Sequence, residues 1–119
     1  MPEEYDKLVR DGIPRIIEES GEYPIFHVAD GEAYERRLFE KFEEELGEFR
    51  DNRSLEELAD VLEVVHAFCV HEGWSLESLE RRRQEKADER GGFEDSVVLE
   101  RVVSNGEAIE SDDSSARET

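Results

Sequence analysis

Residues 31–72 decide the fold, and they read GEAYERRLFEKFEEELGEFRDNRSLEELADVLEVVHAFCVHE. The first part, residues 31–51, repeats apolar side chains at steps of three and four, which is typical of an α-helix with one buried face. The second part, residues 55–72, is apolar almost all round, which indicates a helix buried on most sides. Residues 51–54, Asp-Asn-Arg-Ser, form a turn by composition. The stretch therefore predicts an antiparallel helical hairpin.

Acidic residues interrupt the apolar faces of both predicted helices. Glu45 lies where a leucine would be expected, and Glu48 lies at the edge of the same apolar arc. Glu57 and Asp60 are three residues apart and so share a face of the second helix. In a hairpin that turns midway between the helices, residues at equal height have numbers that sum to about 105. Glu48 is therefore expected to face Glu57, and Glu45 to face Asp60.

Four carboxylates that face one another would repel and raise their own pKa values, so a cation is needed to neutralise them. A hard divalent ion with oxygen ligands does so, and Mg²⁺ is the usual one where phosphates complete the coordination, although Ca²⁺ or Mn²⁺ would suit the same oxygens. Two residues have a plain structural alternative. Glu57 could be the third-position acid of a capping box that begins at Ser54, and Glu48 could be solvated. Three further acids are expected to project into solvent on the opposite side: Glu40, Glu43 and Glu44.

The remaining elements follow from the flanking sequence. Residues 5–20 predict a short lead-in and one helix, and residues 75–90 predict a fourth helix that stops at two glycines. Residues 23–28 and 97–103 are rich in β-branched residues and predict two short strands that pair with each other. Residues 104–119 have almost nothing to bury and predict a disordered acidic tail.

These elements together predict one mainly α-helical domain over residues 1–103. It would be a bundle of about four helices with a small two-stranded β element. An apolar helix in so short a chain favours a partner subunit, so we expect a homodimer or homotetramer to complete the bundle.

The net charge limits the classes of function. Acidic residues number 34 against 15 basic ones, a formal charge of −19, which argues against a protein that binds nucleic-acid polymers by neutralising phosphates. High acid content with only three lysines is typical of halophilic proteins, because molar salt screens the repulsion between surface carboxylates. An acidic surface for a basic partner is the alternative.

The location of the protein is also an expectation from sequence. One cysteine, Cys69, cannot form an internal disulfide, and the N-terminal residues Met1-Pro2-Glu3-Glu4 lack the basic and apolar regions of a signal peptide. No apolar run approaches the roughly 20 residues that span a bilayer. We expect a cytoplasmic protein without a membrane partner.

The order of the motifs is similar to that of the MazG-like superfamily of all-α nucleoside triphosphate pyrophosphohydrolases. The long helix carries Glu44-Glu45-x-x-Glu48, and the apolar helix opens with Glu57-x-x-Asp60. The two flanking motifs resemble the small house-cleaning branch, which is also likened to phosphoribosyl-ATP pyrophosphohydrolases: Lys7-Leu8-Val9-Arg10-Asp11-Gly12-Ile13-Pro14 and Lys86-Ala87-Asp88-Glu89-Arg90-Gly91-Gly92-Phe93.

The resemblance implies Mg²⁺-dependent cleavage between the α and β phosphates of a nucleotide, including noncanonical triphosphates, with Mn²⁺ as a substitute. It also implies that the metal is held, and catalysis carried, by Glu45, Glu48, Glu57 and Asp60. The ligand set leaves Glu44 open as an alternative to Glu45, although the apolar arc favours Glu45. Hydrolysis of phosphoribosyl-ATP in histidine synthesis is a second enzymatic alternative. A non-catalytic acidic helical interaction module is the third.

Four cations are candidates for binding substrate phosphate: Lys86, Arg90, Lys7 and Arg10. Lys86 and Arg90 share a face at a helix C-terminus, where stabilisation of the helix dipole is the structural alternative. The sequence offers no zinc site, because His66 and Cys69 share a helical face but fall short of the three or four ligands that zinc requires.

Overall fold

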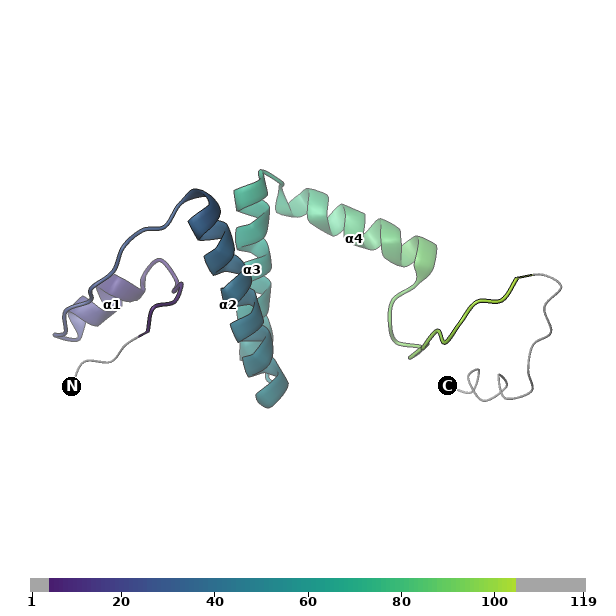
Figure 1. Cartoon of the computed structure of the whole chain (residues 1–119), viewed down its shortest axis with the longest axis horizontal. Coiled ribbons are helices and arrows are strands. Elements are labelled where there is room, and N and C mark those ends of the chain that lie inside the picture. Colours follow the sequence, from purple (N-terminus) through teal and green to yellow (C-terminus); the bar gives the residue numbers. More distant parts are fainter. Residues whose placement is uncertain (1–4, 105–119) are drawn as a thin grey trace. The chain divides into compact units, whose positions relative to one another are not determined.

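The structure, a computed structural model, describes residues 5–104. Four α-helices follow in chain order, and this part of the chain contains no strand (Figure 1). They are α1 (Ile13–Glu19), α2 (Gly31–Asp51), α3 (Leu55–Glu72) and α4 (Leu76–Arg90). The chain divides into two compact units, Met1–Leu76 and Glu77–Thr119, and each is described by itself. The prediction of a mainly helical chain with four helices is confirmed.

Local sequence explains where α2 and α3 begin and end. Asp30 is extended and precedes α2, although its side chain makes no capping hydrogen bond. The hydroxyl of Ser54 accepts a hydrogen bond from the backbone N–H of Glu57 at 3.2 Å and so caps α3. Gly73 ends α3 in the left-handed conformation (φ +81°), which glycine adopts without strain. Both helices have the bounds that the sequence predicts.

α2 and α3 pack side by side as a hairpin (Figure 1). Three residues, 52–54, join the two helices, a length typical of an antiparallel helical hairpin. The buried apolar side chains of the described chain all come from this pair: Leu38, Val61, Val64 and Cys69. Phe39 and Phe42 of α2 add ring contacts to Phe68 of α3, with centroids 4.8 Å and 6.2 Å apart. This hairpin is the scaffold that positions the acidic residues.

The two predicted strands are not formed in the described residues, so the β element is a correction to the sequence analysis. Residues 23–28 and 97–103 are irregular, and Tyr23, Ile25 and Val98 expose 93%, 99% and 73% of their surface. A strand needs a neighbouring strand for its backbone N–H and C=O groups, and composition cannot supply that partner.

The flanking parts of the chain are simpler. α1 has Pro14 in its first turn, where proline is tolerated, and Gly12 occupies the N-cap. α4 is exposed along its length, with Arg83 paired to Glu80 at 2.6 Å. The predicted acidic tail lies outside the described residues, apart from Ser104. No helix among residues 5–104 combines the length and the apolar character needed to cross a bilayer.

Candidate functional site

The hairpin brings the predicted acidic residues together in two overlapping groups. Glu45, Glu57 and Asp60 each present a carboxylate oxygen, and these oxygens all lie within 4.8 Å of one another. Glu44, Glu45 and Glu48 meet the same limit. Glu45 belongs to both groups and joins the carboxylates of α2 to those of α3. We call these five residues the carboxylate cluster.

Glu45 is the buried member of the cluster. It exposes 7% of its surface, because it lies on the apolar side of α2 that packs against α3. Its Oε2 atom is 2.9 Å from Nζ of Lys41. Its Oε1 atom is also buried but has no hydrogen-bond partner, alone among the buried side-chain polar atoms of the described residues. A buried carboxylate oxygen without a partner destabilises the folded protein unless a cation or a hydrogen-bond donor contacts it.

Repulsion between the acids changes their protonation. Proximity to Glu45, followed by loss of hydration, raises the pKa of Glu48 above its usual value. Loss of hydration, followed by the charges of Asp60 and Glu45, raises the pKa of Glu57. The backbone N–H of Glu57 also donates to the hydroxyl of Ser54, the N-cap of α3, so the place of Glu57 at the helix start and its place in the cluster coexist. The cluster therefore holds more negative charge than its surroundings neutralise.

Glu44 differs from its sequence-based prediction. It was expected to project into solvent beside Glu40 and Glu43, but it is half-buried and belongs to the cluster. Burial would raise its pKa, yet hydrogen bonds from Lys7 and Lys41 outweigh burial and lower the pKa. The Nζ atoms of these lysines lie 2.8 Å and 3.2 Å from its carboxylate oxygens.

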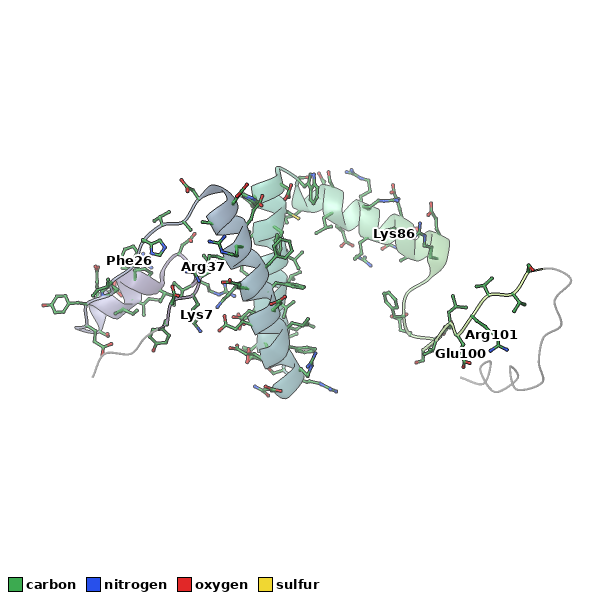
Figure 2. All side chains as sticks on the ribbon, viewed as in Figure 1. Lys7, Phe26, Arg37, Lys86, Glu100 and Arg101 are labelled. Atoms are coloured by element: carbon green, nitrogen blue, oxygen red, sulfur yellow. The ribbon has the colours of Figure 1, made fainter. Side chains whose placement is uncertain are left out.

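The lead-in segment, residues 5–12, crosses the cluster and supplies two of the predicted phosphate-binding cations. Lys7 pairs with Glu44, and Nη2 of Arg10 lies 2.7 Å from Oδ1 of Asp60. The guanidinium of Arg37 on α2 anchors the segment by donating to the carbonyl and the carboxylate of Asp6, at 3.1 Å and 2.9 Å. Figure 2 labels Arg37 and Lys7. Lys7 and Arg10 are thus held beside the acids of both helices.

The other two predicted phosphate-binding cations, Lys86 and Arg90, belong to the second unit. Both are exposed on α4, where Figure 2 labels Lys86. Arg90 lies in the last turn of α4, the position expected for stabilisation of the helix dipole.

Sequence reasoning missed two contributions to the site, Lys41 and Arg37, and it named Glu44 only as the alternative to Glu45 in the ligand set. Lys41 precedes Glu44 and Glu45 by three and four residues, a spacing that places side chains on one helix face and could have identified it. Arg37 has no such signal, because its partner Asp6 is 31 residues away.

A separate group of possible ligands lies near the other end of the hairpin. Glu35, His71 and Glu72 present atoms within 4.8 Å of one another, and His71 Nε2 is 3.0 Å from Glu35. The possible zinc ligands considered from sequence were His66 and Cys69. Neither belongs to a group of three possible ligands among residues 5–104. Cys69 is instead buried in the core.

Searches of protein-family profiles, curated proteins and solved structures found no match to this chain. The resemblance to the MazG-like superfamily therefore stays a prediction from the motifs.

The raised pKa values of Glu48 and Glu57 predict a pH dependence of stability in the absence of divalent metal. The folded protein binds more protons than the unfolded chain between pH 4.5 and the raised pKa values, so these groups lower stability as the pH rises through that window. Glu44 has the opposite effect, because its pKa is lowered: its contribution to stability is lost as the pH falls below 4.5, outside this window. Urea unfolding in EDTA at about pH 5 and about pH 7 measures the change. In the double variant Glu48→Gln/Glu57→Gln, the difference in unfolding free energy between the two pH values should be much smaller. If that difference is unchanged, Glu48 and Glu57 are not its source.

Proposed function

We propose that the protein is a Mg²⁺-dependent nucleotide pyrophosphohydrolase that cleaves the α–β phosphate bond of a nucleoside triphosphate. The observation that carries the proposal is the buried Oε1 of Glu45, which has no hydrogen-bond partner. Glu45 also belongs to both groups of residues whose carboxylate oxygens lie within 4.8 Å of one another. All the donors are carboxylate oxygens, and these are the ligands that Mg²⁺ and Mn²⁺ prefer. The chemistry of the donor set therefore fits the proposed metal.

In this proposal the metal is held by Glu45, Glu48, Glu57 and Asp60. When bound, it supplies charge stabilisation of the phosphates and activation of water. A cluster carboxylate accepts the proton of the attacking water, and the raised pKa values of Glu48 and Glu57 bring those two groups nearer to neutral pH. Lys7 and Arg10 of the lead-in neutralise phosphate oxygens, because they are the cations held beside the cluster. Lys86 and Arg90 stay further candidates.

Pyrophosphate release from a panel of nucleotides tests the function directly. The panel holds canonical and noncanonical triphosphates, the corresponding diphosphates and phosphoribosyl-ATP, each assayed with Mg²⁺, with Mn²⁺ and with EDTA. We expect metal-dependent release of pyrophosphate from triphosphates. Hydrolysis of phosphoribosyl-ATP alone would favour the second enzymatic function, and no release from any substrate would leave a non-catalytic acidic module.

We also propose that two copies of the hairpin associate through exposed leucines of α3. Leu55, Leu58 and Leu62 recur at steps of three and four, and they expose 83%, 46% and 53% of their surface. On α2, Phe39 and Leu46 expose a further 60% and 42%. Two such hairpins would form a four-helix bundle in which these side chains are buried.

The double variant Leu58→Lys/Leu62→Lys is expected to be monomeric under conditions in which the unaltered protein is a homodimer or homotetramer. Lysines at these positions would have to be desolvated in the bundle. Light scattering coupled to size-exclusion chromatography measures the mass. Val70→Lys, at a residue that exposes 77% of its surface outside the leucine series, is the control and should keep the assembly. A monomeric unaltered protein would refute the proposal.

A further inference from the structure

Three cations of the chain itself pair with three members of the carboxylate cluster: Glu44, Glu45 and Asp60. Lys41 lies 3.2 Å from Glu44 and 2.9 Å from Glu45, and its side chain is only 15% exposed. Lys7 and Arg10 of the lead-in pair with Glu44 and Asp60 at 2.8 Å and 2.7 Å. Both helices of the hairpin therefore have an acidic residue already paired with a basic one.

These ion pairs and a bound divalent cation compete for the same carboxylates. Asp60 and Glu45 belong to the group whose oxygens lie within 4.8 Å of one another, and each is paired with a cation. A doubly charged ion at those oxygens would repel the ammonium of Lys41 and the guanidinium of Arg10 at short range. Binding of the ion would therefore weaken these ion pairs.

The lead-in would keep its place when its ion pairs break, because it has an anchor outside the cluster. Arg37 holds Asp6 by two hydrogen bonds and exposes only 25% of its side chain. Asp6 is not one of the grouped carboxylates. Lys7, next in sequence, and Arg10, four residues on, would remain within reach of a ligand at the cluster.

We infer that Lys7, Arg10 and Lys41 are internal counter-ions that a divalent cation displaces, and that Lys7 and Arg10 then bind substrate phosphate. The inference rests on the proposed function and adds its regulation: the metal binds first and frees the cations that the polyphosphate needs. Lys41 has a different role, because its partners lie three and four residues away on its own helix. Its ion pairs weaken when the divalent cation binds, but it does not go on to bind substrate phosphate.

The test compares two affinities in purified variants. Mn²⁺ affinity is measured by titration calorimetry, and affinity for imidodiphosphate, a nonhydrolysable pyrophosphate, is measured at saturating Mn²⁺. Lys7→Ala/Arg10→Ala is expected to bind Mn²⁺ about fivefold more tightly, since two competing ion pairs are gone, and imidodiphosphate about fivefold more weakly. Lys41→Met is expected to tighten Mn²⁺ binding alone.

The control Arg15→Ala/Arg36→Ala removes the same charge from exposed positions of the same unit and should leave both affinities unchanged. Thermal unfolding of each variant confirms that it folds. If Lys7→Ala/Arg10→Ala lowers both affinities or leaves the Mn²⁺ affinity unchanged, the inference is wrong while the metal site stands. If the unaltered protein binds no Mn²⁺, or binds it equally well after Glu48→Gln/Asp60→Asn, the proposed function itself fails.

Discussion

The double variant Glu48→Gln/Asp60→Asn is expected to lower Mg²⁺-dependent pyrophosphate release by about 100-fold or more. The change keeps the size of both side chains but removes two negative charges, one from each helix of the hairpin. The remaining carboxylates would hold a divalent ion with fewer and weaker ligands. The measurement is the initial rate of pyrophosphate release with the best triphosphate of the panel, across a range of Mg²⁺ concentrations.

A matched control separates loss of ligands from loss of charge. Glu43→Gln/Glu63→Gln removes the same two charges from exposed positions on the same two helices, outside the cluster. Its rate should stay within about twofold of the unaltered protein, because solvated surface charges contribute little. Equal activity in the two double variants would remove the metal assignment from Glu48 and Asp60.

Leu38→Ala is expected to lower the free energy of unfolding by about 3 kcal/mol, since it empties the best-buried position of the hairpin. Leu38 exposes 1% of its surface, and few other side chains are buried as deeply. The hairpin also sets the height at which Glu45 meets Asp60, so a weaker core is expected to reduce activity as well. Urea denaturation monitored by circular dichroism measures the change in stability.

Ile25→Ala is the control for that experiment. Ile25 loses a similar volume of hydrocarbon but exposes 99% of its surface, so the change should stay within about 0.5 kcal/mol. If Leu38→Ala were no more destabilising than Ile25→Ala, the α2–α3 contact would not be the core of this protein.

Much of the hairpin and the approach of Glu45 to Asp60 could be predicted from sequence, whereas the structure brings Glu48 and Glu57 into two groups that share only Glu45. The bounds of α3 follow from Ser54 and Gly73, whose preferences act over one helical turn. The approach of Glu45 to Asp60 follows from the short turn and the rise of an α-helix. Both arguments use only neighbouring residues and standard geometry.

The prediction failed where a partner far along the chain was needed. The apolar residues 23–28 were expected to pair as a strand, but no described segment supplies the matching backbone groups. Glu44 was expected to be solvated, because helix periodicity alone places it away from the apolar arc. It is half-buried because Lys7, 37 residues earlier, pairs with it.

The sequence by itself therefore determined the helices, the hairpin and the four acids that converge on one place, since each depends on spacing within or just beyond a single element. Only the tertiary structure decided which cations meet those acids. Arg10 reaches Asp60 across 50 residues, and Arg37 holds the segment that brings it there. Within one helix, the number of residues between two side chains determines whether they share a face. Between residues this far apart in sequence, that number says nothing about their distance, which only the folded chain sets.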